Sequence, residues 1–120
     1  MLRVTKYVLM LLAGAVLPAF AADITGHWSF DGDVEGNPVK HECDFKQDGA
    51  QLSGTCKSTE RDPWTIAGKV DGSKVTFSYD AEHEGEKYNL VYTGTLDGDS
   101  TLKGEIEVAG VTGDFTAKKQ

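Results

Sequence analysis

A chain of 120 residues supplies one small domain, and its composition already excludes several kinds of partner. It has 19 acidic and 12 basic residues, which give a formal net charge of −7 at pH 7. A negative surface repels phosphate backbones and anionic membranes, so we expect no nucleic-acid partner. A small molecule or a basic protein surface is compatible with this charge.

The first 21 residues have the features of a secretory signal peptide. Arg3 and Lys6 form a positive start, residues 7–17 are almost wholly apolar, and Ala21 marks the expected cleavage position. The apolar run is too short to span about 30 Å of hydrocarbon, so we expect cleavage and no membrane attachment afterwards. The remaining domain, residues 22–120, carries a charge of about −9, because the leader holds two of the basic residues and none of the acidic ones. These features predict a periplasmic or secreted protein.

Residues 22–120 show an almost unbroken alternation of apolar and polar residues with a period of two. Such alternation is typical of strands with one buried face, and helical periodicity is absent. We expect eight strands, at 24–31, 38–47, 51–58, 64–70, 73–80, 86–96, 100–108 and 111–118. Short Asp-Gly turns connect strands at one end. At the other end we expect longer loops, at 32–37, 59–63 and 81–85.

One face of these strands carries all nine aromatic residues that follow the leader, and no charged residue. Eight strands with a single apolar face bury it without exposed edges when the sheet closes on itself. The sequence therefore predicts an all-β protein, a single eight-stranded antiparallel up-and-down β-barrel after a signal peptide. Glycines recur on the inward face, which favours sharply bent strands at barrel corners.

Cys43 and Cys56 are the only cysteines, and strand pairing across the turn at 49–50 places them opposite each other. Directly opposed residues have Cα atoms about 4.5–5.5 Å apart, which suits a disulfide. An exported chain meets an oxidising compartment, so we expect this bond to form. A metal site is not expected, because two thiolates alone lack the further ligands that an ion needs.

Gly26-His27-Trp28 on the first strand, followed by a meander of short antiparallel strands, resembles the calycin superfamily of lipocalins, avidins and their relatives. The resemblance implies that Trp28 is a structural plug at the closed end of a barrel. A second resemblance is to the periplasmic inhibitors of bacterial metalloproteases. The same Gly26-His27-Trp28, with Cys43-Asp44-Phe45 and Cys56, carries it and implies a protein-interaction role.

Motifs of catalysis are missing from the sequence. The nucleophile elbow, the H-E-x-x-H zinc motif, the P-loop and the dinucleotide fingerprint are all absent. His41-Glu42 and His83-Glu84 each lack the second histidine of a zinc motif. The sequence predicts a protein that is not an enzyme and that needs no cofactor.

Four residues are the predicted ligand-binding set: His41, Trp64, Tyr79 and Tyr88. The alternation places His41 inside the barrel near the loop-rich end, where the three aromatic residues are expected to cluster around it. A small hydrophobic or cationic molecule is the expected ligand. In the alternative interpretation, His41 bonds to a tyrosine hydroxyl and the aromatic residues simply fill the barrel.

Two further questions stay open at the level of sequence. Asp31, Asp33 and Glu35, with Glu42 at the twelfth position, match the spacing of a calcium loop, although we favour a solvated acidic turn as their explanation. The function also has alternatives to a binding barrel. One is a protein-interaction module such as an envelope protease inhibitor, whose acidic loops would suit a basic partner. Another is a structural envelope protein without its own ligand.

Overall fold

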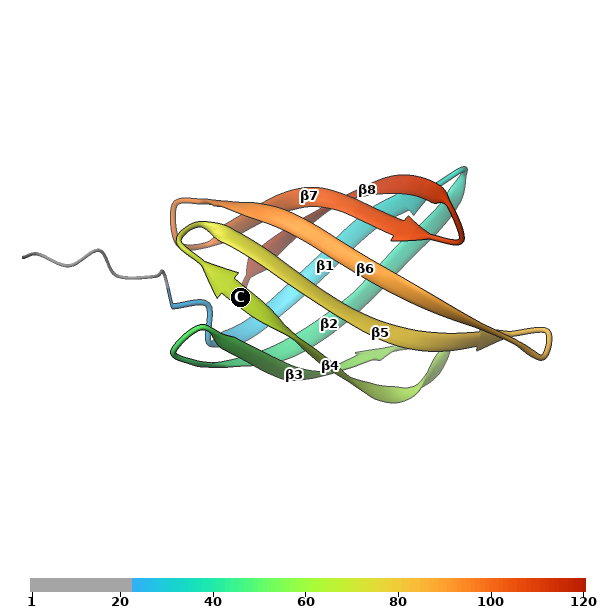
Figure 1. The fold of residues 1–120 in the computed structure, drawn as a ribbon, viewed down its shortest axis with the longest axis horizontal. Helices are drawn as coiled ribbons and strands as arrows, with labels where there is room; N and C mark the ends of the chain where they lie inside the picture. Colours follow the sequence, from blue (N-terminus) through green and yellow to red (C-terminus); the bar gives the residue numbers. More distant parts are fainter. Residues whose placement is uncertain (1–22) are drawn as a thin grey trace, which may run out of the picture.

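The computed structural model describes residues 23–120, so the predicted signal peptide lies outside the described residues. Its strands are β1 (Gly26–Val34), β2 (Asn37–Asp48), β3 (Gln51–Ser58), β4 (Arg61–Asp71), β5 (Lys74–His83), β6 (Glu86–Asp97), β7 (Thr101–Val108) and β8 (Val111–Lys119). Each strand pairs antiparallel with the next, and β8 returns to pair with β1 (Figure 1). The predicted closed, sequential eight-stranded barrel is confirmed. Residues 23–120 include no helix that is both long and apolar enough to cross a membrane.

The predicted long loops do not exist, because the strands extend farther than the alternation indicated. β1 continues to Val34, β4 begins at Arg61 and β5 continues to His83. The three connections shrink to two-residue turns at 35–36, 59–60 and 84–85. Two of these turns pair a residue of positive φ with a glycine of positive φ, which is the requirement of a type I′ hairpin turn. The polar composition of these segments is typical of a loop, because both faces of a projecting hairpin are exposed to water.

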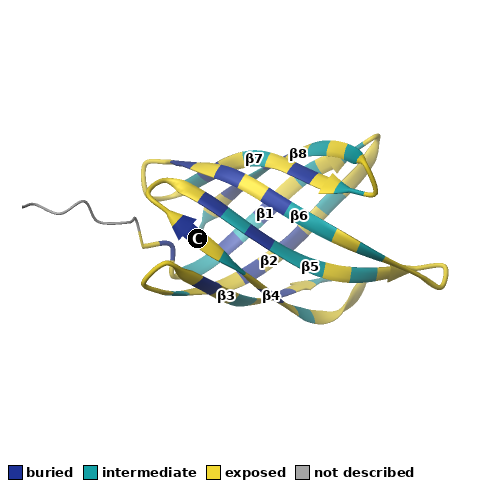
Figure 2. Ribbon diagram, in the orientation of Figure 1, coloured by how far each residue is buried: buried dark blue, intermediate teal, exposed yellow. Residues whose placement is uncertain are grey.

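The inward faces of the strands form the core, and Figure 2 shows buried and exposed residues alternating along each strand. Phe30 lies at its centre, with ring centroids 5.6–5.9 Å from four other aromatic rings, those of Phe45, Phe77, Tyr92 and Phe115. All five rings belong to buried residues. The aromatic side chains therefore fill the interior of the barrel.

The barrel has one sealed end, formed by the turns at 49–50, 72–73 and 98–100, which we call the plugged end. Trp28 is fully buried there, and its Nε1 donates a hydrogen bond of 2.9 Å to the carbonyl of Ile24. The amide of Ile24 in turn donates to Oε1 of Gln47. Trp28 thus has the plugging position that the sequence indicated, with its one polar atom satisfied.

Inward glycines permit close approach of neighbouring strands. Gly94 and Gly104 face each other across β6 and β7. A Cβ atom added to Gly104 would lie only 1.9 Å from the carbonyl oxygen of Thr93. Glycine is therefore required at this position, because any side chain would force the two strands apart.

The disulfide between Cys43 and Cys56 is present, as predicted. The two residues are register partners across β2 and β3, and their Cα atoms are 4.0 Å apart. Both are buried in the core. The bond therefore joins neighbouring strands midway between the two ends of the barrel.

Candidate functional site: the barrel mouth

The end of the barrel opposite Trp28 is open, and we call it the mouth. Its inward-facing residues are Val34, Val39, Trp64, Tyr79, Tyr88, Leu90, Val108 and Val111. The β5–β6 hairpin projects past the other strands, as Figure 1 shows, because the pairing of β6 with β7 begins only at Leu90. Leu90 is consequently only half-buried, although it lies on the inward face.

An apolar pocket of about 380 Å³ opens at the mouth. Its main walls are Val34, Ala81, Tyr88, Leu90, Val108 and Val111, which come from β1, β5, β6, β7 and β8. Ligand sites in proteins have volumes of about 300–1,000 Å³ and mainly apolar linings. This pocket is at the small end of that range and suits a compact apolar molecule.

The pocket ends where the aromatic core begins. Tyr92 lies two residues farther along β6 than Leu90, and its ring stacks on Phe77 with centroids 4.7 Å apart. Tyr92 and Phe77 are both almost fully buried. The apolar pocket at the mouth therefore does not extend into the barrel interior, where these rings lie.

A chain of hydrogen bonds lies just below the mouth. Nε2 of His41 is 3.0 Å from the hydroxyl of Tyr92, which is itself 3.0 Å from the hydroxyl of Tyr79. On its other side, Nδ1 of His41 faces Sγ of Cys43 at 3.4 Å. A disulfide sulfur carries no proton, so Nδ1 is the protonated nitrogen and Nε2 accepts from Tyr92. Tyr79 then donates its hydroxyl proton to the oxygen of Tyr92, and Tyr92 donates its own to His41.

Burial determines the protonation of this chain. It lowers the pKa of His41 from 6.5 to about 4, with a smaller contribution from the positive charge of Arg61. Burial likewise raises the pKa values of the Tyr79 and Tyr92 hydroxyls above their usual range. The three groups are therefore neutral at pH 7. Such a chain anchors side chains in place and offers no ionised group for acid–base chemistry.

The β4 side of the mouth is closed by side chains instead of backbone pairing. β4 pairs with β5 only over 67–71, so its residues 61–66 have no partner in β5. Trp64 and Tyr79 fill this gap with ring centroids 5.3 Å apart, and the guanidinium of Arg61 lies 4.2 Å from the Trp64 ring. Nε1 of Trp64 is buried and has no hydrogen-bond acceptor within residues 23–120.

The structure brings together three of the four predicted ligand-binding residues. His41 lies with its ring centroid 5.4 Å from Trp64 and 6.5 Å from Tyr79. Tyr88 lies apart from them, opposite Ala81 in the projecting hairpin, where it lines the apolar pocket. The reason is that β6 begins before its pairing with β7, so Tyr88 lies beyond the end of the closed barrel.

Sequence reasoning missed two contributors to this region. The alternation places Tyr92 on the inward face. Its bond to His41, however, joins β6 to β2, which are not neighbours, and alternation carries no information on such contacts. Arg61 was assigned to a loop, although it begins β4 and stacks on Trp64. The sequence signal for this contact was an arginine, Arg61, three residues before the inward-facing Trp64.

The acidic segment from Asp31 to Glu42 is a hairpin and not a loop. Asp31 lies 3.5 Å from Nζ of Lys40, and the carboxylate of Asp33 accepts a bond of 2.7 Å from the amide of Gly36. The twelfth-position residue, Glu42, points to Nε2 of His27 at 2.8 Å. The carboxylates thus have separate partners along two strands, which favours a solvated acidic turn over a calcium loop.

Comparison with known proteins assigns no family to this chain. No family model matches it, and neither does any curated protein sequence. Solved structures of designed barrels are similar. The barrel EF1p2_mFAP2b bound to DFHBI is 13% identical with a TM-score of 0.61, over 81% of this chain and 94% of that one. The redesigned barrel mFAP1 bound to DFHBI is 12% identical, again with a TM-score of 0.61 over 81% and 94%. A fluorescence-activating barrel designed de novo is 10% identical with a TM-score of 0.59, over 80% and 93%. At these identities the similarity establishes the fold alone.

Proposed function

We propose that this protein is an exported, non-enzymatic barrel that binds a small, mainly hydrophobic molecule at its mouth. The apolar pocket of about 380 Å³ carries the proposal, because most of its lining residues are aliphatic or Tyr88, although Glu35, Asn37 and His83 also line it. Similar designed barrels are bound to the small molecule DFHBI, which supports a ligand role for a barrel of this topology.

One further feature favours a particular property in the ligand. Acidic side chains, among them Glu35 and Glu86, surround the mouth and attract a positive group. A compact hydrophobic molecule, neutral or cationic overall, meets these conditions.

Export, the lack of catalysis and kinship with the calycins belong to the same proposal. The leader with Arg3 and Lys6 supports export, and the Cys43–Cys56 bond suits an oxidising compartment. The absence of catalytic motifs from the sequence supports a binding role. The plugging position of Trp28 supports a place near the lipocalins and avidins.

Binding of Nile red, a neutral apolar dye, tests the proposal directly. We expect its fluorescence to rise on mixing with the protein, and we expect Leu90→Gln to weaken binding by about ten- to a hundredfold, since a buried amide without a partner costs about 1–3 kcal/mol. Val91→Gln is the matched control, because Val91 adjoins Leu90 but faces the opposite side of β6. Equal affinities of both variants, or no binding by the wild type, would rule the pocket out.

A second candidate function is recognition of a basic protein segment, and the projecting β5–β6 hairpin favours it. β5 lacks a β4 partner beyond Ser78, and β6 lacks a β7 partner before Leu90, so both edges of the hairpin are open. Residues 79–89 carry four acidic side chains against one lysine: Asp80, Glu82, Glu84 and Glu86, with Lys87. An extended basic segment could add to such an edge as a further strand.

Photo-crosslinking in the host distinguishes this second candidate. A crosslinker at position 82 should capture a defined partner that high salt displaces, whereas one at Lys103 on the outside of β7 should not. The same bands at both positions, or none at position 82, would eliminate the hairpin as a docking site.

A further inference from the structure

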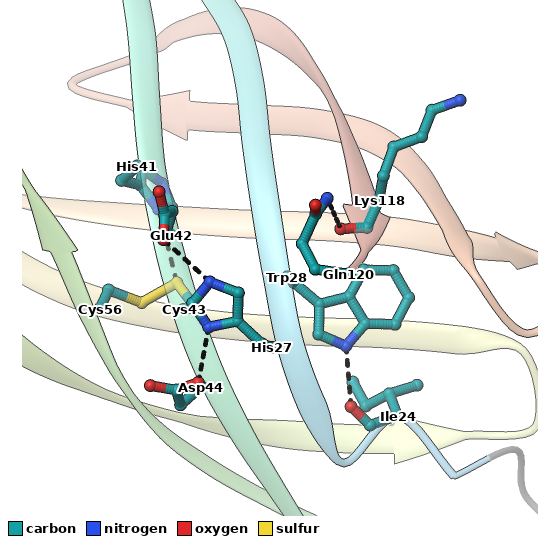
Figure 3. A network of polar contacts seen from close by, with 10 residues as sticks. All are labelled: Ile24, His27, Trp28, His41, Glu42, Cys43, Asp44, Cys56, Lys118 and Gln120. Atoms are coloured by element: carbon teal, nitrogen blue, oxygen red, sulfur yellow. Dashed lines mark hydrogen bonds and ion pairs between the residues drawn. A yellow bond between two sulfur atoms is a disulfide. The ribbon is translucent and has the colours of Figure 1, made fainter.

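Three metal-ligating side chains lie together below the mouth, outside the apolar pocket. His41, Cys43 and Cys56 place one ligand atom each within 4.8 Å of one another, and all three residues are buried. Figure 3 shows the imidazole of His41 beside the disulfide. While the disulfide is intact its sulfurs are bonded to each other, so they have no thiolate charge to offer an ion.

The strand register produces this arrangement. His41 and Cys43 are two residues apart on β2, so their side chains point to the same face. Cys56 lies directly opposite Cys43 on β3. A single hairpin therefore presents three ligands to one point, without contribution from a flexible loop.

We propose that the reduced form of this protein binds a divalent thiophilic ion, such as zinc, through His41, Cys43 and Cys56. A phosphine reductant supplies two electrons and takes the oxygen of one water molecule, whose two protons go to the sulfurs, so that the sulfur–sulfur bond breaks and two thiols form beside a phosphine oxide. Binding of the ion then makes two metal–sulfur bonds and releases both protons. Nδ1 of His41 provides the third ligand.

The hydrogen-bond chain accommodates this change by reversing its direction. When Nδ1 binds an ion, the imidazole proton must lie on Nε2, which then donates to the hydroxyl of Tyr92. Tyr92 in turn donates to Tyr79, whose own proton becomes free. A metal-bound histidine almost always has such a partner on its second nitrogen, and here it already lies at 3.0 Å.

Charge balance selects a divalent ion. Two thiolates carry two negative charges, and an uncompensated charge is costly in a buried site. Cys43 and Cys56 are at most 1% exposed, and Phe30 stacks on the His41 ring at 4.7 Å. A divalent ion makes the site neutral, whereas monovalent copper leaves one negative charge uncompensated. Sulfur and imidazole ligands together suit zinc and its spectroscopic substitute, cobalt.

Cobalt titration of the reduced protein tests the proposal. The full chain after signal removal is reduced with an excess of a phosphine without oxygen, and Co²⁺ is added. We expect one ion per chain, with a sulfur-to-cobalt charge-transfer band that zinc abolishes. His41→Phe retains the stacking on Phe30 and should weaken binding by more than the about 10- to 100-fold that loss of an outer-shell partner costs.

Two controls keep the result interpretable. His27→Gln removes a histidine that contacts β2 from outside the barrel, and it should leave cobalt affinity unchanged. The oxidised wild type should show no charge-transfer band. If the reduced chain is unfolded, zinc should restore its β-sheet circular dichroism. No cobalt band together with no such recovery, or an affinity equal in His41→Phe, would overturn the proposal.

Discussion

The two ends of the barrel have the same alternation of residues, yet only one end is sealed. At the plugged end, inward residues such as Leu52, Val75 and Leu102 are at most 2% exposed. At the mouth, inward residues such as Val34 and Leu90 remain half-buried. The difference is that the strands at the mouth continue past their neighbours. An inward orientation therefore buries a side chain only where the opposite wall reaches the same level.

Truncation of the plug should have the largest effect. Trp28→Ala removes a fully buried ring and its bond to the Ile24 carbonyl, and we expect a loss of about 3–5 kcal/mol in unfolding free energy. Tyr88→Ala at the mouth should lose about 1 kcal/mol or less. Urea unfolding of both variants measures the contrast between the ends. Similar losses would contradict it.

Removal of the disulfide should have the next effect. Cys43 and Cys56 are 13 residues apart, and on the chain-entropy model a loop of this size stabilises the fold by about 3 kcal/mol. The double variant Cys43→Ala, Cys56→Ala should therefore unfold at lower urea concentration, with a steeper slope because the unfolded chain without the crosslink exposes more surface. Because the bond lies between the ends, the hydrogen-exchange protection of both should fall together. Loss of protection at the mouth alone would show that the two ends unfold independently.

The protonation of His41 should destabilise the protein in acid. Its pKa is about 4 in the folded state and 6.5 when unfolded, so the unfolded chain binds the proton more tightly. The contribution of neutral His41 to the free energy of unfolding is fully present above about pH 6.5 and is lost as the pH falls towards 4. The loss should approach roughly 2–3 kcal/mol over this window. Urea unfolding from pH 7 to 4 measures it, and His41→Phe should lack this component. The same pH dependence in both proteins would refute the assignment.

His27 should show the opposite and smallest effect. The carboxylates of Asp44, and then of Glu42, accept hydrogen bonds from the His27 imidazole and raise its pKa in the folded state. Its contribution is therefore present below the unfolded pKa of 6.5 and is lost as the pH rises through the folded value. Solvent screening limits it to about a few tenths of a kcal/mol, since the side chain is 36% exposed. An NMR titration of the imidazole measures the shift, and a lowered pKa would contradict it.

The candidate site was only partly accessible from the sequence. The alternation correctly placed His41 inside the barrel, and in the structure its ring lies beside those of Trp64 and Tyr79. It did not indicate that Tyr92 is the residue bonded to His41, or that Tyr88 lies in a projecting hairpin. Polar residues on the outside of a projecting hairpin follow the same pattern as a loop, so their composition cannot distinguish the two.

The sequence by itself determined the features that depend on neighbouring strands. Alternation specified the inward face, and counting from the turn at 49–50 specified the partnership of Cys43 with Cys56. Only the tertiary structure decided what meets across the barrel: the bond from His41 to Tyr92, the walls of the pocket, and the gap between β4 and β5. The physical reason is that a short turn sets the register of two adjacent strands. Contacts across the interior depend on the stagger accumulated around all eight strands, which no local segment encodes.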